Sequence, residues 1–266
     1  MSAVGREDLQ AVFAEYPWGI CPFEAIRDRL LPVRSLQRLP DGAKTVFLVL
    51  FPYLLDEDVY AQTQLSRYAV SADYHLLCGE KLDAMCTRLQ EIFPGNTFVR
   101  FTDASPIPEV YAAACAGLGK IGKNGLLLHK DFGSWVFIGE IVTDLYVPCE
   151  AAAPVLCDGC NACVQACPTG ALSADGVCVQ RCLSHISQKR KLTDDDVSLL
   201  RAHTVLWGCD RCQLACPQNR NAKTTFDISF KSTVKTVPDR DDPQRAYAWR
   251  GEAVFRNLGL LEQEKE

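Results

Sequence analysis

Nine of the 14 cysteines lie in one segment of the sequence, between positions 157 and 216, and their spacing predicts iron-sulfur chemistry. The segment opens with C-x2-C-x2-C-x3-C followed by proline, which is the spacing of bacterial ferredoxins. In such a run three thiolates wrap one iron-sulfur cube and the fourth binds a second cube. A later run, GCDRCQLACP, repeats the pattern with its first cysteine missing. The sequence therefore predicts two clusters, both 4Fe-4S, with one ligand supplied from elsewhere.

The missing ligand has two candidates, Cys178 and Cys182. Cys182 is favoured because it begins the run RCLSHISQ just after an expected strand, which leaves Cys178 spare. The crossed-ligand rule of two-cluster proteins then assigns the ligands. The first cluster takes Cys157, Cys160, Cys163 and Cys216, and the second takes Cys167, Cys182, Cys209 and Cys212.

Zinc is the alternative metal, since pairs of cysteines separated by two residues also form zinc sites. Zinc has no preference for the ferredoxin order, so two such runs in one short segment favour iron-sulfur clusters. The remaining five cysteines stand singly in apolar or helical surroundings and are expected to be buried and unreactive. They are Cys21, Cys78, Cys86, Cys115 and Cys149.

Composition and charge narrow the class of protein. Hydrophobic residues make up 48% and charged residues 23% of the chain, as in ordinary globular proteins. The net charge of -5 shows no overall excess of basic residues of the kind that nucleic-acid-binding proteins carry. No apolar run approaches the roughly 20 residues of a membrane span, and the first residues show no secretion signal. We therefore expect a cytoplasmic protein without membrane contact. Because the cytoplasm is reducing and disfavours disulfides, clustered thiols in such a protein are expected to bind metal or to carry out redox chemistry.

Hydrophobic periodicity predicts an α/β (α+β) fold in which a mixed-sheet domain precedes a ferredoxin-like double-cluster domain. Helices are expected at 6–16, 74–93 and 109–118. Strands are expected at 43–53, 97–102, 125–129 and 134–144, with the last two paired around a turn. We expect a ligand-binding α/β domain at 1–150, the double 4Fe-4S domain at 151–220, and a tail at 221–266 that packs on the body.

Two clusters alone do not explain the 150 residues that precede them, and here the sequence resembles a known family. From about Ser66 to Pro217 it is similar to the epoxyqueuosine reductases, cobalamin-dependent iron-sulfur enzymes of tRNA modification that are related to reductive dehalogenases. The matching segments keep the family's order and spacing. They are SRYAVSADYH, TDASPIPE, AGLGKIGKNGLLL, GSWVFIGEIVTDL, CDGCNACVQACPTGAL, RCLSHIS and GCDRCQLACPQNR.

The resemblance implies that the front domain binds cobalamin without a protein ligand below the cobalt, and that the nearer cluster, the second, reduces it. Asp103 holds the position of the family's proposed proton donor. A carboxyl group with a raised pKa in a closed pocket can protonate the oxyanion left by epoxide opening. The alternative role for Asp103 is that of a turn residue at a strand end. Family positions for corrin contact fall on Leu127, His129 and Ile138.

Two departures from the family bear on the substrate. Ser71-Ala72 replaces the usual Gly-Arg, which removes an arginine suited to substrate or phosphate contacts. The helical-repeat tail of some members is also absent, so a short variant is expected. The expected partners are a tRNA substrate and an external electron donor such as a flavodoxin or ferredoxin. The alternatives are a cobalamin-dependent reductase of a smaller substrate and a two-cluster electron-transfer protein.

Overall fold

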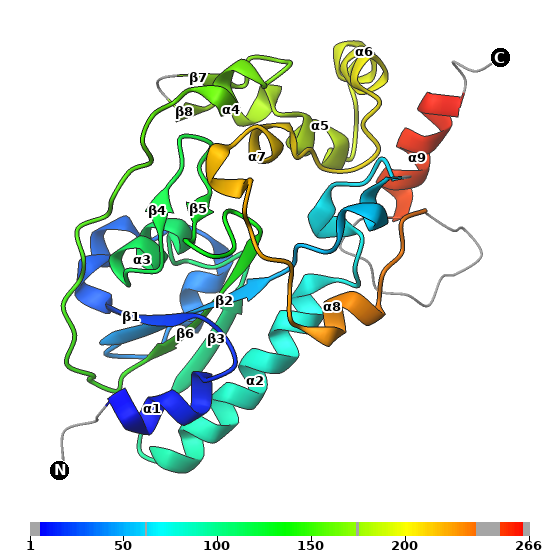
Figure 1. The fold of residues 1–266 in the computed structure, drawn as a ribbon. Coiled ribbons are helices and arrows are strands. Elements are labelled where there is room, and N and C mark those ends of the chain that lie inside the picture. The colour runs from blue at the N-terminus through cyan, green and yellow to red at the C-terminus, as the bar shows by residue number, and fades with distance from the viewer. Residues whose placement is uncertain (1–5, 62, 174–175, 238–250, 263–266) are drawn as a thin grey trace.

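A four-stranded sheet forms the centre of the computed structural model, which describes residues 6–61, 63–173, 176–237 and 251–262 (Figure 1). The strands lie in the order β1 (Trp18–Pro22), β2 (Thr45–Pro52), β6 (Val136–Thr143) and β3 (Phe98–Thr102). Each neighbouring pair is antiparallel. The expected combination of sheet and helices is confirmed.

Both faces of the sheet are covered, which explains why all eight residues of β2 are buried. Side chains alternate between the two faces of a strand. Phe47 and Val49 therefore fall into different layers from Val46 and Leu48. The first layer packs under α1 (Arg6–Phe13) and α2 (Tyr74–Ile92), and the second under α3 (Glu109–Cys115). Asp73 caps α2 by accepting a hydrogen bond from the backbone of His75, 2.9 Å away.

Two features of the sheet differ from the sequence-based expectation. Strand β1 was not expected. Strand β5 (Leu127–Leu128) was expected to pair with β6, but it pairs with β4 (Lys120–Ile121). An isolated bridge joins His129, the last residue of the first expected arm, to Gly133 in the turn that follows it. The reason is that both edges of β6 are occupied, one by β2 and the other by β3.

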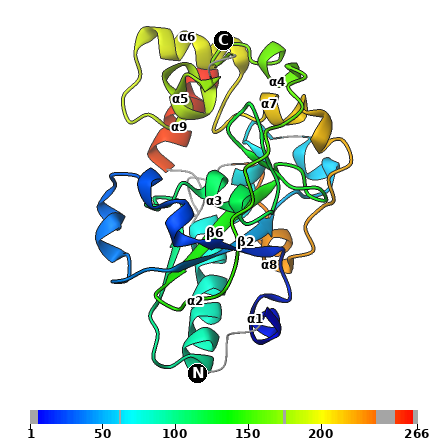
Figure 2. The same cartoon turned by 90° about the vertical axis from the view of Figure 1, so that its left-hand side faces the viewer.

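The cysteine-bearing segments lie together at one end of the sheet, above it in Figures 1 and 2. They comprise α4 (Ala162–Gln165), β7 (Leu172–Ser173), β8 (Gly176–Val177), α5 (Leu183–Gln188), α6 (Asp194–His203) and α7 (Arg211–Leu214). Short 3-10 turns complete the described structure at Phe23–Ala25, Arg27–Arg29, Arg34–Arg38, Glu57–Tyr60, Arg67–Ala69, Val179–Arg181 and Pro217–Asn219. No helix within the described ranges is long and apolar enough to span a membrane.

The chain after position 220 packs on two separate hydrophobic clusters. Helix α8 (Ile228–Ser232) buries Phe230 in the layer that contains α1 and α2, and α9 (Gly251–Glu262) buries Val254 in the cluster that contains Trp207. The backbone of Thr225 also donates to Leu54 O at 2.6 Å. Residues 238–250 and 263–266 of the expected tail lie outside the described residues.

Candidate redox and active site

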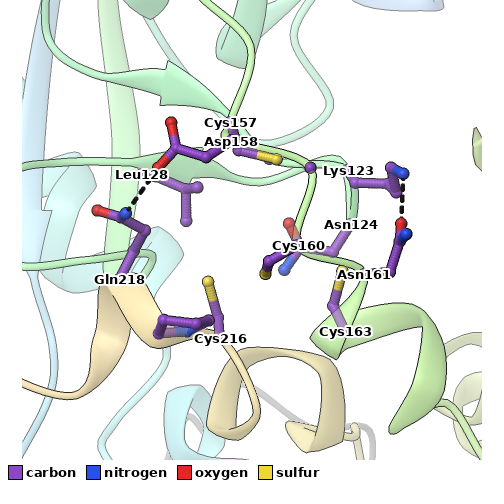
Figure 3. Close-up of a pocket in the computed structure, with 13 residues that line it drawn as sticks. Lys123, Asn124, Leu128, Cys157, Asp158, Cys160, Asn161, Cys163, Cys216 and Gln218 are labelled. Carbon is purple, nitrogen blue, oxygen red and sulfur yellow. Dashed lines mark hydrogen bonds between the residues drawn. The ribbon is translucent and has the colours of Figure 1, made fainter.

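Four cysteines from two separate segments surround one cavity of about 150 Å³. Gly159 and Asn161 adopt left-handed backbone angles, with φ of 70° and 62°, which let the loop curve around the cavity. Figure 3 shows the four sulfur-bearing side chains at its rim. They are Cys157, Cys160, Cys163 and Cys216.

A second cavity, of about 60 Å³, is surrounded by four further cysteines. Burial raises the pKa of the Cys212 thiol to about 12. Such a thiol stays protonated at neutral pH unless a metal replaces its proton. The cysteines around this cavity are Cys167, Cys182, Cys209 and Cys212, the same four that the crossed-ligand rule groups together.

The arrangement of the thiols suits an iron-sulfur cube better than a zinc ion. Within the described part of the chain, no three His, Cys, Asp or Glu side chains converge to hold a single metal ion. The thiols instead surround two spaces, each from four sides. Cys178 lies exposed and lines neither cavity.

Asn124 lies between the two thiol-lined cavities and borders both. Its Oδ1 accepts a hydrogen bond from the backbone of Leu126 at 3.4 Å. A Cβ on Gly122 would stand 2.3 Å from that oxygen, so only glycine admits this packing. The amide nitrogen Nδ2 is buried, and the Asn124 side chain lowers the pKa of the Cys212 thiol against the larger effect of burial. An N–H donor is therefore available to sulfur at the boundary between the cavities.

A third cavity, of about 170 Å³, brings Asp103 together with Leu127 and Ile138, two of the three expected corrin contacts. It shares Asp103 and Glu109 with a larger opening of about 500 Å³. His129 is not part of it, because this side chain lines a separate cavity with Trp18. Its Nδ1 there accepts from the backbone of Asp131 at 3.1 Å.

A hydrogen bond links the wall of the Asp103 cavity to the helix that carries Cys212. Ser134, which lines this cavity, donates to Gln213 Oε1 at 2.8 Å. Gln213 follows Cys212 on α7. Through Gln213, the helix that carries Cys212 therefore contacts the wall of the Asp103 cavity.

The electrostatic environment of Asp103 contradicts the expected raised pKa. Its Oδ2 accepts a hydrogen bond from the Tyr74 hydroxyl at 2.9 Å and lies 3.2 Å from His75 Nε2. The bond to His75 is the main cause that lowers the pKa of Asp103 to about 2. The carboxyl side chain is also 59% exposed rather than enclosed. Asp103 is thus ionised at neutral pH.

His75 holds the proton of this arrangement. Its Nδ1 lies 2.6 Å from Asp73 Oδ1, so a carboxylate stands at each ring nitrogen. Hydrogen bonding to Asp103, and then to Asp73, raises the pKa of His75 to about 9. The sequence carries no local signal for this role of His75, because its partner Asp103 lies 28 residues further along the chain.

Two glutamates near Asp103 were also missed, of which Glu140 is fully buried and Glu109 is half-buried. Glu140 is 0% exposed and neither of its carboxyl oxygens has a hydrogen-bond partner. Oε1 of Glu109 is likewise buried without a partner. The available signal was a single acidic residue inside the otherwise apolar strand VFIGEIV.

Family models match two parts of the chain. Residues 34–104 match the model described as epoxyqueuosine reductase QueG. Residues 156–219 match that of a 4Fe-4S double cluster binding domain, so the predicted double-cluster domain is confirmed.

Curated relatives match most of the chain. The epoxyqueuosine reductase of Lactococcus garvieae is 34% identical over 224 residues, which is 82% of this chain and 61% of the relative. That of Leadbetterella byssophila is 33% identical over 211 residues, 77% of this chain and 69% of the relative. That of Escherichia coli is 33% identical over 77% of this chain and 56% of the relative. The chain thus spans between half and about two thirds of the length of these relatives.

Solved structures share the fold. Epoxyqueuosine reductase from Streptococcus thermophilus superposes with a TM-score of 0.77 at 22% identity, covering 96% of this chain and 80% of that one. An epoxyqueuosine reductase with a tRNA-Tyr epoxyqueuosine-modified stem loop gives 0.79 at the same identity and coverage. The reductive dehalogenase NpRdhA gives 0.50 at 14% identity, covering 97% of this chain and 35% of that one. With sequence matches of this extent and identity, the chain belongs to the epoxyqueuosine reductase family.

Proposed function

We propose that this chain is an iron-sulfur and cobalamin-dependent oxidoreductase that reduces epoxyqueuosine to queuosine in tRNA. One observation carries the proposal. Asp103 faces a cavity with Leu127 and Ile138, and the helix that carries Cys212 contacts the wall of that cavity. The curated relatives bear the name of this activity.

The eight thiols hold two 4Fe-4S clusters in this proposal. Cys157, Cys160, Cys163 and Cys216 bind the first cluster, and Cys167, Cys182, Cys209 and Cys212 bind the second. Cys160 is exposed, so the first cluster lies at the surface, where an external donor such as a flavodoxin or ferredoxin can deliver electrons. The second cluster would pass electrons on toward the Asp103 cavity, whose wall contacts α7 through Gln213.

The residues around the Asp103 cavity fit cobalamin bound without a protein ligand to cobalt. Leu127, Val136 and Ile138 provide apolar walls. None of the residues that line this cavity is a His, Cys or Met, the side chains that bind cobalt most readily. Bound cobalamin supplies a cobalt centre that relays electrons to the substrate. Leu127 and Ile138 would contact the corrin ring, whereas His129 faces another cavity.

The protein's own part in the chemistry is to hold a proton beside the reacting oxygen. Loss of an epoxide oxygen creates negative charge on that oxygen, and a positioned acid stabilises it by protonation. Asp103 and His75 form this acid as a pair, since the histidine retains the proton and the carboxylate borders the cavity. The Tyr74 hydroxyl holds the carboxylate in place.

A smaller substrate is the second candidate, favoured by one local feature. Where the family carries Gly-Arg, Ser71 is 3% exposed and donates to Phe230 O at 2.9 Å, and the backbone of Ala72 donates to Thr233 Oγ1. Helix α8 and the residue after it thus contact this position, and no arginine reaches the substrate from it. A cytoplasmic location is part of the proposal, and the tRNA substrate of the proposed reaction supports it.

The test is conversion of epoxyqueuosine tRNA by anaerobically reconstituted protein. Iron, sulfide, cobalamin and a low-potential reductant are added, and the nucleosides are analysed by mass spectrometry. We expect queuosine to form only with all components present. No conversion by protein whose clusters and cobalamin are spectroscopically reduced would contradict the tRNA substrate and leave the smaller-substrate reductase.

A further inference from the structure

Glu140 places a carboxyl group inside the molecule, behind the Asp103 cavity. It stands at the centre of β6, opposite Leu48 on one side and Phe101 on the other. Strand alternation puts it on the same face as Ile138 and Val142. Both of these pack in the layer that contains α3. Glu140 therefore faces the layer under α3 from a fully buried position, with both carboxyl oxygens unpartnered.

Glu109 belongs to the layer that Glu140 faces, and it also borders the cavity. It is the first residue of α3, and it lines both openings that Asp103 lines. Its Oε1 is buried and has no hydrogen-bond partner. The side chain thus connects the interior of the α3 layer with the space in which the substrate would react.

The charges around the two glutamates favour a retained proton. The charges of Asp103 and His75 affect the pKa of Glu109, and the charges of Glu109 and Asp103 affect the pKa of Glu140. The one cationic group among them, His75, is engaged by Asp73 and Asp103. Burial, and next the charge of Asp103, raises the pKa of Glu109 to about 7. Burial, and next Glu109, raises the pKa of Glu140 well above its ordinary value, although the nearby Ser105 hydroxyl opposes this rise.

Two neighbouring buried carboxyl groups cannot both ionise without strong repulsion. An ionised carboxylate without a partner is also costly to bury. The pair therefore keeps at least one proton at neutral pH. Asp103 itself keeps none, because its pKa is about 2.

The proposed reaction needs more than one proton. Reductive removal of an epoxide oxygen as water consumes two electrons and two protons. The clusters deliver the electrons, and the His75–Asp103 pair supplies one proton. We propose that Glu109 and Glu140 form a buried carboxyl pair that stores the second proton and delivers it through Glu109 to the departing oxygen. This inference rests on the proposed function.

The transfer balances without another reagent. The O–H bond of Glu109 breaks as an O–H bond forms on the departing oxygen, and the proton of Glu140 then moves to Glu109. The pair regains its proton from solvent through the larger opening. Leu31 and Val33 at its rim are 44% and 37% exposed. Glu109 is a catalytic residue in this scheme, and Glu140 acts through it.

The first test is infrared spectroscopy, which needs neither cobalamin nor substrate. The wild-type protein should show the carbonyl stretch of a protonated, buried carboxylic acid at neutral pH, and Glu140→Gln should lose it. Glu109→Gln is the second variant. It changes a residue at the edge of a cavity rather than inside the sheet, so it tests the same pair with less disturbance of the fold. The control is Glu91→Gln, an exposed position at the far end of α2, which should keep the band. A wild-type spectrum without the band would overturn the proposal.

The second test is the pH profile of a single turnover by fully reduced enzyme. Because Glu109 is protonated below about pH 7, the wild-type rate should fall as pH rises through that value. Glu140→Gln and Glu109→Gln should lower the rate at neutral pH by at least about tenfold with unchanged substrate affinity. A wild-type profile in both variants would refute the proton store. Wild-type protein with the infrared band but without queuosine formation would refute the proposed function alone.

Discussion

His75 Nε2 lies 3.2 Å from Asp103 Oδ2, so the expected proton donor is one half of an ion pair. Asp73, at the other ring nitrogen, stabilises the same positive charge from 2.6 Å. The expected raised carboxyl pKa was wrong for this reason: a cation adjacent to a carboxyl group favours its ionised form. The proton at this site is held on His75, and Asp103 orients it at the cavity.

Replacing Asp103 with Asn should lower kcat by about a hundredfold or more, since general acid catalysis contributes roughly 10²–10⁴-fold. The amide keeps the shape of the side chain but removes the charge that holds the His75 proton. Single-turnover assays at neutral pH measure the effect. Asp58→Asn, at an exposed position, is the matched control, and equal rates for the two variants would contradict the role of Asp103.

The ion pair also predicts a pH-dependent contribution to stability. The folded pKa of His75, about 9, lies above its ordinary value, so this contribution is fully present below about pH 6.5 and is lost as pH rises through 9. Both side chains are more than a third exposed, at 43% and 59%, so screening keeps the contribution small. Thermal melts of wild type and His75→Gln should therefore differ near pH 6 and coincide above pH 10. A difference that grows with pH would be inconsistent with the ion pair.

The ligand assignment predicts different outcomes for two nearby cysteines. Cys182→Ser should reduce reconstituted iron from about eight to about four atoms per chain, because the second cluster loses one corner. Cys178→Ser should keep the full iron content, since this exposed thiol borders neither cavity. Iron analysis and electron paramagnetic resonance of the reduced protein measure both. Loss of a cluster in Cys178→Ser alone would reverse the assignment.

Asn124 is expected to raise the potential of the cluster whose sulfur it approaches. Its buried Nδ2 can donate to sulfur, and such hydrogen bonds stabilise the reduced, more negative cluster. Asn124→Leu should lower the midpoint potential by up to about 59 mV, a tenfold change in the ratio of reduced to oxidised cluster. A redox titration followed by electron paramagnetic resonance measures it. Gln218→Leu at the rim of the first cavity is the control, and identical potentials in wild type and Asn124→Leu would rule out the hydrogen bond.

The sequence by itself determined the elements and the cluster motif, because both depend on short-range patterns. The apolar run of β2 and the helical period of α2 appear in the structure within a few residues of their predicted bounds. The spacing of the first four cysteines is the one with which a loop places three thiolates around one 4Fe-4S cluster and the fourth on the other. Even the crossed grouping of Cys216 with the first set could be argued from the order of ligands in related motifs.

Only the tertiary structure decided the features that depend on contacts between distant segments. β5 pairs with β4 because β2 and β3 occupy both edges of β6. Asp103 is ionised because the start of α2 brings His75 against it, and burial under the α3 layer raises the pKa of Glu140. The pKa of a side chain depends on burial and on neighbouring charges, and neither is a property of the local sequence.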